Sequence, residues 1–315
     1  MEVASWLSEF EPPPEVPAAF IEQLRHQLQE SSMAAAKRLR QEAPGQIPIR
    51  LPKSRLADLD CCERKAVAAS EMDPMQQSIT ESMLRGLAVD RFVTHQLVAG
   101  RVLEPVDAFE SMLRAEQEEA AVQALHALGA EAAAAMIDPL AAQVADAWTG
   151  IDPAWVPRTQ SKASAVFADG AVVSSGIIDV ELGGPSAGVP AVIVEVKSGK
   201  PVAAHQAEVY SYALLVALRD GSAPGAVARW YPGLDLAAVS VSEGLLASAA
   251  LRLEQGILRW TELLLGRSPD ESPGPWCNWC PDNERCPSRG VEVRVQASRQ
   301  EFDPEFDPEF DPEFD

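Results

Sequence analysis

Residues 176–179 read Gly-Ile-Ile-Asp and residues 191–197 read Ala-Val-Ile-Val-Glu-Val-Lys, and these two runs decide the fold. The second run is apolar and β-branched, which favours a buried strand. Because side chains two positions apart share one face of a strand, Glu195 and Lys197 are expected to project together while the valines beside them face the core. The first run ends a neighbouring strand, so Asp179 is expected to join that pair at the edge of the sheet.

The elements around these runs predict an α/β core. Residues 159–182 alternate apolar and small polar side chains around the turn Asp169-Gly170, which is typical of a β-hairpin. A Gly/Pro loop precedes the strand of residues 191–197. The core then continues as a helix at 203–219, strands at 226–231 and 237–241, and a helix at 243–265. The predicted order is β-β-β-α-β-β-α.

The chain before this core is expected to be helical. Pro and Gly in residues 43–52 break the first helix, and the Ala/Glu-rich stretch is expected to be interrupted near Asp138-Pro139. The predicted helices cover residues 16–42, 54–70, 76–99 and 105–148.

Asp179, Glu195 and Lys197 form a set that suits phosphodiester chemistry. Two carboxylates can hold one or two divalent cations, which polarise a phosphate and lower the pKa of a bound water. A lysine beside them can orient that water or stabilise developing charge. An isolated E-x-K is weak, because strands often carry an exposed charged pair, but the preceding Asp and the following helix strengthen the interpretation.

The five cysteines indicate a metal centre. Cys61 and Cys62 are followed, far along the chain, by Cys277-x2-Cys280-x5-Cys286 in a loop rich in Pro and charged residues. No basic start or apolar stretch of a signal peptide is present, so a cytoplasmic, reducing location is expected, where clustered cysteines bind metal more often than they form disulfides. Three thiolates of the loop lack one ligand, which either cysteine of the upstream pair can supply. Four cysteines suit zinc or an iron–sulfur cluster equally well.

The order Asp, then Glu-Val-Lys, then Gln206-x3-Tyr210 on the next helix resembles the RecB-like branch of the PD-(D/E)xK nucleases. One cysteine before the core and C-x2-C-x5-C after it is similar to the iron–sulfur subgroup, which includes CRISPR-associated adaptation nucleases and AddB-type helicase–nucleases. The run Lys53-Ser-Arg-Leu56 also resembles the start of that subgroup. The resemblance covers about residues 50–290, and its fold is a restriction-endonuclease-like core with a central mixed sheet flanked by helices.

The resemblance carries further expectations. It implies catalytic roles for Gln206 and Tyr210 beside Asp179, Glu195 and Lys197. It favours Cys62 over Cys61 as the fourth ligand and a 4Fe-4S cluster over zinc, with ligands Cys62, Cys277, Cys280 and Cys286. The family's usual histidine ligand four residues after a glycine is here Asp90, after Gly86. The expected Mg²⁺ or Mn²⁺ ligands are therefore Asp90, Asp179 and Glu195.

The resemblance also suggests six segments. They are an N-terminal helical extension (1–49), a helical segment with the first cluster cysteine (50–100), a helical lobe (101–150), the nuclease core (151–268), a C-terminal cluster loop (269–290) and a disordered acidic tail (291–315).

The formal net charge of −21 argues against a surface that binds nucleic acid everywhere, so DNA contact is expected from local patches. The candidate basic residues are Arg64, Lys65, Arg158, Lys162, Lys197 and Lys200. Residues 301–315 repeat Glu-Phe-Asp-Pro and carry eight acids and no base. A solubilising tail and a peptide that binds a partner protein are both open interpretations. No apolar run approaches the roughly 18–20 residues that cross a bilayer, so no membrane contact is expected.

The expected function is a Mg²⁺- or Mn²⁺-dependent DNA nuclease, exonuclease-like on single-stranded ends or flaps, in repair, recombination or phage defence including CRISPR adaptation. No Walker-type GKT or GKS occurs, so a helicase would be a separate partner, and an integrase-type protein is the other expected partner. The alternative is a catalytically weak or inactive nucleic-acid-binding or assembly subunit that retains the fold and the cluster. A redox-sensing cluster protein is a third hypothesis.

Overall fold

The computed structural model describes residues 3–72, 80–99, 104–115, 123, 125, 127–202 and 204–289. The chain divides into two compact units. The first comprises Met1–Ala57 and Pro74–Arg267, and the second comprises Asp58–Asp73 and Ser268–Asp315. The first unit contains the sheet, and the second contains all five cysteines.

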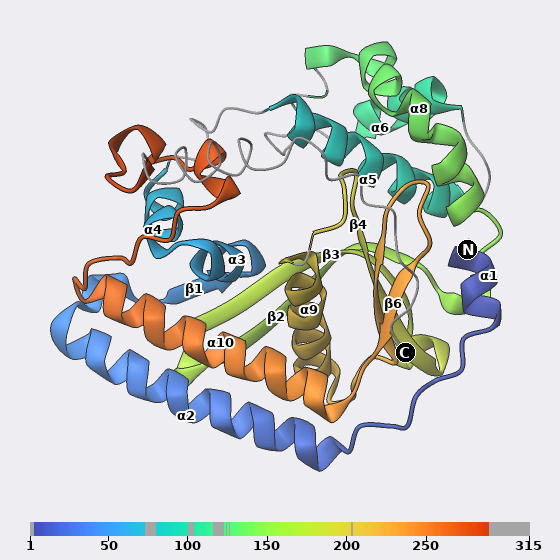
Figure 1. Cartoon of the computed structure of the whole chain (residues 1–315). Coiled ribbons are helices and arrows are strands. Elements are labelled where there is room, and N and C mark those ends of the chain that lie inside the picture. Colours follow the sequence, from blue (N-terminus) through green and yellow to red (C-terminus); the bar gives the residue numbers. More distant parts are fainter. Residues whose placement is uncertain are drawn as a thin grey trace, which may run out of the picture. The chain divides into compact units, whose positions relative to one another are not determined.

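The first unit is built on a mixed six-stranded sheet (Figure 1). Its strands are β1 (Ile49–Pro52), β2 (Arg158–Phe167), β3 (Val172–Gly184), β4 (Val189–Val196), β5 (Ala226–Trp230) and β6 (Ala237–Ser240). The order is β1-β3-β4-β5-β6, with β2 paired to β3. The pairs β1–β3 and β4–β5 are parallel, and β2–β3, β3–β4 and β5–β6 are antiparallel. An α/β fold with a mixed sheet is thus confirmed.

The long strand β3 creates a gap in the sheet where chemistry can be placed. β2 pairs along one edge of β3 from residue 172 to residue 181, so β1 and β4 must share the other edge. β1 pairs with residues 172–175 and β4 pairs from Val180 onward. Since β1 runs parallel and β4 antiparallel to β3, the carboxyl ends of both strands meet at residues 176–179, between the two ladders.

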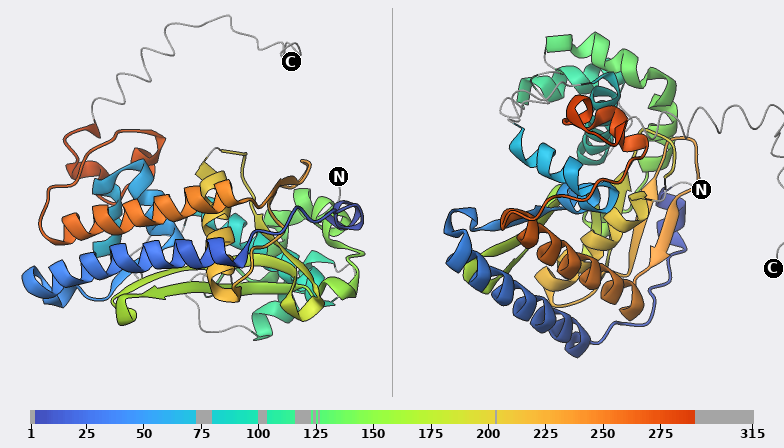
Figure 2. Two further views of the ribbon diagram at one scale, coloured as in Figure 1. Left: turned by 90° about the horizontal axis from the view of Figure 1, so that it is seen from below. Right: turned by 60° about the vertical axis from the view of Figure 1, so that its left-hand side comes forward.

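Helices pack on both faces of this sheet. In the first unit they are α1 (Val3–Ser8), α2 (Ala18–Glu42), most of α3 (Lys53–Cys61), α5 (Glu81–Ala99), α6 (Pro105–Ala115), α8 (Ala130–Trp148), α9 (Ala204–Asp220) and α10 (Glu243–Leu264). α2 and α10 run side by side and both contact α9, which packs on the sheet (Figures 1 and 2). α5, α6 and α8 pack on one another and share a buried core with alternate residues of β3, β4 and β5. Val194 and Val196, on either side of Glu195, are buried, as the alternation of side chains along this strand predicted.

The predicted order β-β-β-α-β-β-α is confirmed as β2-β3-β4-α9-β5-β6-α10. β1 was missed, because it has only four residues and lies in the segment expected to be a loop. The single helix predicted at 54–70 is wrong: Cys62 is extended, with φ −166° and ψ 122°, and separates α3 from α4 (Glu63–Glu71). The predicted interruption at Asp138-Pro139 is also wrong, since Pro139 lies inside α8, which begins after Gly129 at φ 83°.

The second unit is small and contains α4 and two short 3₁₀ helices, η6 (Pro275–Trp279) and η7 (Asn283–Arg285). The tail predicted at 291–315 lies outside the described residues. Of the helices that the structure describes, none combines the length and apolar character needed to span a membrane.

Candidate active site and cysteine centre

The gap in β3 holds the predicted carboxylates and lysine. Asp179 lies in it, and its Oδ2 accepts a hydrogen bond of 2.8 Å from the backbone N–H of Val196 at the end of β4. This side chain therefore takes the place of a backbone acceptor at the strand end. Glu195 is 3% exposed, and its Oε1 lies 2.9 Å from Lys197 Nζ. The structure thus brings Asp179, Glu195 and Lys197 together, and the alternation correctly predicted the pair Glu195 and Lys197. The expectation that Asp179 ends a strand at the edge of the sheet is wrong, because β3 continues to Gly184 and is paired on both sides.

A second lysine joins this cluster from the end of β1. Lys53, the first residue of α3, places its Nζ 2.5 Å from Glu195 Oε1 and 3.2 Å from Glu208 Oε2. Glu208, on α9, is also 2.9 Å from Lys197 Nζ. Two ammonium groups and two carboxylates therefore alternate in a partly buried quartet. Burial raises the pKa of Glu208, but the two ammonium groups more than offset this and lower the pKa to about 2.

The ion pairs of the quartet use only one oxygen of each carboxylate. Glu195 Oε2 is buried and, among the described residues, has no hydrogen-bond partner. A buried acceptor without a partner is costly unless a ligand or ion satisfies it. Burial and the charges of Glu195 and Asp90 raise the pKa of Asp179 well above its ordinary value. This crowding of carboxylates disfavours ionisation of Asp179 and favours a cation beside it.

Asp90 reaches this region from α5 and interacts electrostatically with Asp179. Gln160 Nε2 donates to both carboxylate oxygens of Asp90, at 3.0 Å each. Gln160 lies in β2 opposite the β3 gap and has φ 52°, a conformation that side-chain-bearing residues rarely adopt. The strained Gln160 therefore orients the carboxylate of Asp90.

From α9, Glu208 and Tyr212 contact the lysines of the cluster. Gln206 Nε2 donates to Tyr210 Oη at 2.5 Å, and neither side chain makes a hydrogen bond or ion pair with Glu195 or Lys197 in the described part of the chain. Two residues correspond to about 200° on a helix, so Glu208 and Tyr212 lie on the other side of α9. Lys53 Nζ is 4.8 Å from the centroid of the Tyr212 ring. The catalytic roles of Gln206 and Tyr210 stay predictions.

Close packing places Tyr212 against the gap in β3. A Cβ on Gly176 would lie 2.5 Å from Cε1 of Tyr212, so glycine is needed for this approach. Tyr212 Oη donates to the backbone carbonyl of Ile177, which lies inside the gap. The tyrosine thus satisfies a strand carbonyl and forms one wall of the site.

The second unit gathers four cysteines. Cys62, Cys277, Cys280 and Cys286 line one small cavity, and Cys61 is not among its lining residues. Burial and the neighbouring Cys62 and Cys286 raise the pKa of the Cys280 thiol. The backbone N–H of Gly274 donates to Cys277 Sγ at 3.4 Å. Four cysteines that line one cavity are a ligand set of the kind that zinc and iron–sulfur clusters take.

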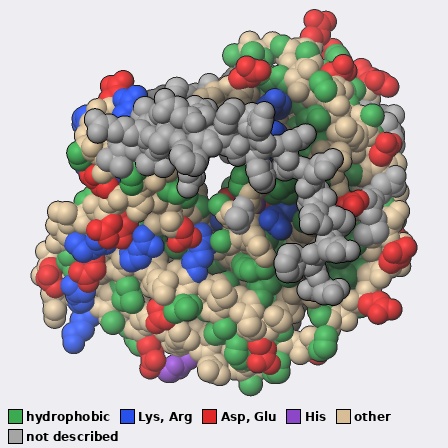
Figure 3. Space-filling view, viewed as in Figure 1, with side chains coloured by type: hydrophobic (Ala, Val, Ile, Leu, Met, Phe, Trp, Pro, Cys, Tyr) green, Lys and Arg blue, Asp and Glu red, His purple; other side chains and the backbone are tan. Residues whose placement is uncertain are grey.

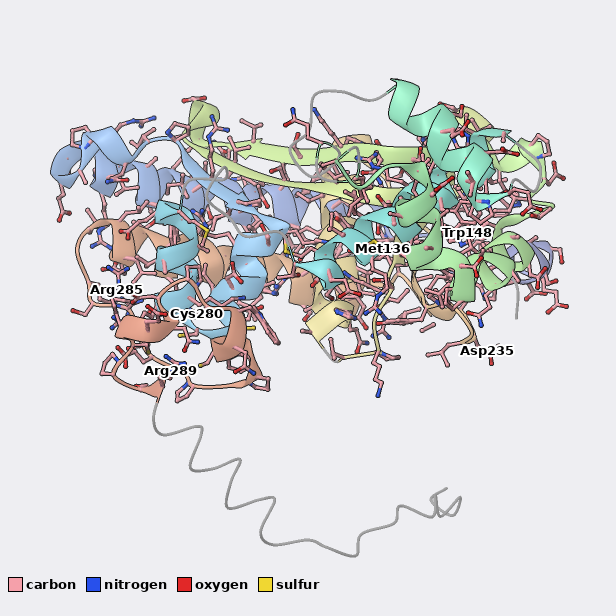
Figure 4. The ribbon with its side chains drawn as sticks, turned by 90° about the horizontal axis from the view of Figure 1, so that it is seen from above. Met136, Trp148, Asp235, Cys280, Arg285 and Arg289 are labelled. Carbon is pink, nitrogen blue, oxygen red and sulfur yellow. The ribbon has the colours of Figure 1, made fainter. Side chains whose placement is uncertain are left out.

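Arg64 holds the loop of this centre in place. Its Nε lies 2.6 Å from Asp282 Oδ2, its Nη1 2.7 Å from Glu271 Oε1, and its Nη2 donates to the Arg285 carbonyl at 3.4 Å. Cys280 and Arg285 lie in this loop (Figure 4). Because α4 begins directly after Cys62, the guanidinium links the upstream cysteine to the downstream loop.

Whether a metal ion fits the site depends on the arrangement and the chemical type of its side chains. In the described ranges, no group of three or more His, Cys, Asp or Glu side chains stands in an arrangement that would hold an ion. The carboxylates of Glu195 and Asp179 are nevertheless the type of oxygen ligand that Mg²⁺ and Mn²⁺ prefer. Glu195 Oε2 lacks a partner among the described residues, and the negative charges of Glu195 and Asp90 lie near Asp179. One divalent cation would neutralise the formal charge of −2 that the site carries when all its groups are ionised. The groups counted are two lysines (Lys53 and Lys197) and four acids (Asp90, Asp179, Glu195 and Glu208).

Most of the predicted basic contacts are engaged within the protein. Arg158 pairs with the buried Glu181 at 2.8 Å, and Lys65 pairs with Asp58. On the face shown in Figure 3, basic side chains lie among acidic ones, and acidic side chains are scattered over the region of α6 and α8. Lys162 is exposed and makes no ion pair with the described residues. Among these candidate basic residues, an exposed positive charge outside an ion pair is therefore found at single positions such as Lys162, and not over a broad surface.

Sequence reasoning missed Lys53, Glu208, Gln160 and Tyr212 as members of the site. The alternation Ile-Arg-Leu before Pro52 was the available signal for a strand that would carry Lys53 to the sheet edge. Glu208-x3-Tyr212 has the same helical spacing as the predicted pair Gln206 and Tyr210. Nothing in the sequence alone marks Gln160.

Comparisons with known proteins show little beyond these observations. No family model matches the chain, and no curated protein sequence is significantly similar to it. Among solved structures, the crystal structure of SSO0001 aligns with 73% of this chain and 94% of its own, at 14% identity and a TM-score of 0.31. That degree of similarity carries no functional argument.

Proposed function

We propose that this protein is a metal-dependent DNA nuclease built on a PD-(D/E)xK core. The observation that supports it most is the meeting of Asp179, Glu195 and Lys197 at converging strand ends, with Glu195 Oε2 buried and without a partner among the described residues. Perturbed and crowded carboxylates at such a place are typical of catalytic sites. The expected action, by resemblance, is exonuclease-like on single-stranded ends or flaps.

In this proposal Asp90, Asp179 and Glu195 hold Mg²⁺ or Mn²⁺. When bound, the cation supplies polarisation of the scissile phosphate and a lowered pKa for its water. In the proposed reaction Lys197, which contacts Glu195, orients the attacking water or stabilises charge on the phosphate oxygens. Hydrolysis forms a bond from the water oxygen to phosphorus and breaks the ester bond, whose oxygen leaves with a proton. Glu208 acts as a positioning residue, because it fixes Lys197 at 2.9 Å.

We also propose that Cys62, Cys277, Cys280 and Cys286 bind a 4Fe-4S cluster, with zinc as the alternative. Their common cavity supports a shared centre, and the exclusion of Cys61 from it supports Cys62 as the fourth ligand. The choice of cluster over zinc rests on the resemblance. The centre would link the two separated segments of the second unit and stabilise them by closing a long loop.

The binding partners and the cellular compartment of the protein are expectations from its sequence. DNA is the substrate, a helicase or integrase-type protein is the expected protein partner, and the cytoplasm is the expected compartment. The repeat at 301–315, outside the described residues, is the segment proposed to bind a partner protein.

The test is anaerobic purification, with iron and sulfide quantified, followed by incubation with single- and double-stranded DNA in Mg²⁺ and in Mn²⁺. Degradation is expected with either cation and is expected to be abolished in Lys197→Ala and in Asp179→Ala. Full activity in both purified, folded variants would refute the nuclease proposal.

A second function is supported by one specific observation. Glu195 Oε1 already accepts from two lysines, at 2.5 and 2.9 Å, so side chains of the protein itself offset the negative charge of this carboxylate. This favours a non-catalytic nucleic-acid-binding or assembly subunit. Intact DNA after long incubation with Mn²⁺, together with measurable DNA binding and an intact cluster, would support this second function over the first.

A further inference from the structure

A groove of about 550 Å³ opens beside the carboxylate cluster of the first unit. It is bounded by the end of β1, the middle of β2 and β3, and the Tyr212 ring. Its lining consists of Pro52, Lys53, Ser54, Lys162, Ala163, Ser164, Ser175, Gly176, Ile177 and Tyr212. Lys53 and Tyr212 line the groove, and Lys53 also contacts Glu195, so the groove adjoins the cluster.

The groove is lined by basic and hydroxyl side chains, although one of its two lysines, Lys53, is paired with Glu195 and Glu208 of the cluster. Its lining contains two lysines, three serines and no acid, whereas the protein carries 47 Asp and Glu against 26 Lys and Arg. Lys162 is exposed and has no ion-pair partner in the described structure, so its charge is available to a ligand. Cations and hydroxyl groups together are the usual contacts to phosphate oxygens.

We propose that this groove binds the phosphate backbone of single-stranded DNA and leads it to the carboxylate cluster. Lys53 contacts the phosphate nearest the cluster, and Lys162 contacts a phosphate farther along the strand. This inference rests on the proposed function for the identity of the ligand. It adds the path of the strand, and it assigns Lys162, one of the basic residues expected to contact DNA, to a phosphate of that path away from the reacting atoms.

The observations favour a single strand over a duplex. The volume lies within the roughly 300–1,000 Å³ of sites for small organic ligands, which suits a few linked groups rather than a double helix. A duplex also carries about one charge per 1.7 Å of axis, twice the density of a single strand. A chain with a net charge of −21 repels that density more strongly.

The test is equilibrium binding of a fluorescent oligothymidylate to the full-length protein in EDTA, where no metal-dependent cleavage occurs, over a series of salt concentrations. Lys162→Ala is expected to weaken binding by roughly 2- to 10-fold and to reduce the slope of log K against log salt by about 0.7, the value of one phosphate contact. Lys162→Arg is expected to restore both. The matched control is Lys37→Ala, an exposed lysine on α2 outside the groove, which should leave both unchanged.

Binding and slope unaltered by Lys162→Ala would overturn the proposal, as would a duplex of equal length binding more tightly through Lys162. Cleavage is measured separately with Mn²⁺. Binding that depends on Lys162 without any cleavage would refute the nuclease proposal and leave the groove assignment standing, so the two failures are distinguishable.

Discussion

Replacement of Glu208 by Gln tests the charge quartet at the centre of the site. The side chains of Glu208, Lys53 and Lys197 are 15%, 19% and 19% exposed, so their ion pairs are only weakly screened by solvent. The fall of the Glu208 pKa from 4.5 to about 2 corresponds to roughly 3 kcal/mol at about 1.4 kcal/mol per pKa unit. Glu208→Gln is therefore expected to lower the free energy of unfolding by about 3 kcal/mol at pH 7.

The pH dependence of this loss gives the sharper test. A carboxyl whose pKa is depressed in the folded state stabilises the protein above its unfolded pKa, and this stabilisation is lost as the pH falls toward the folded pKa. In urea denaturation with EDTA, the difference between wild type and Glu208→Gln should stay near its full value down to about pH 5. By about pH 3 it should fall to less than half. Glu11→Gln, an exposed carboxylate between α1 and α2, is the control and should change little. A loss of equal size at pH 7 and pH 3 would refute the electrostatic reasoning.

Three further predictions follow from the same geometry. Asp179→Asn should raise the melting temperature of the metal-free protein at pH 7.5, because burial and neighbouring carboxylates raise the pKa of Asp179 and penalise its charged form. The gain should vanish in acid, where the wild-type carboxyl is protonated. Equal melting temperatures at pH 7.5 would contradict this prediction. Cys62→Ser should abolish iron or zinc binding, measured by metal analysis of the purified protein, whereas Cys61→Ser should retain it; the reverse outcome would assign the other cysteine. Gly176→Ala should destabilise the protein by roughly 1–3 kcal/mol in urea denaturation, because its Cβ would meet the buried Tyr212 ring at 2.5 Å, and an unchanged midpoint would exclude that close approach.

The sequence predicted those parts of the fold that depend on local pattern. The run at 191–197 is apolar enough to specify a buried strand, and the period of two places Glu195 and Lys197 on one face. The Asp169-Gly170 turn fixes the hairpin, since both residues adopt positive φ. These features predicted the core order and the contact of Glu195 with Lys197.

Features set by tertiary packing were not predictable in the same way. Which of two equivalent i, i+4 pairs on α9 faces the sheet depends on the rotation of the helix, which the close approach of Tyr212 to Gly176 determines. β1 is too short for a periodic signal, and its pairing with β3 brings Lys53 to the site from more than a hundred residues away. Pro139 is tolerated within α8, where local preference predicted a break.

The most direct test of the central claim is the initial rate of single-stranded DNA hydrolysis by wild type and Glu195→Gln over a range of Mn²⁺ concentrations. Gln keeps the size of the side chain but removes the charge and one acceptor oxygen, so the lone Oε2 can no longer act as a carboxylate ligand. A metal-dependent nuclease at this site predicts a rate at least about 100-fold lower in the folded variant at every Mn²⁺ concentration. Equal rates in the two proteins would contradict it.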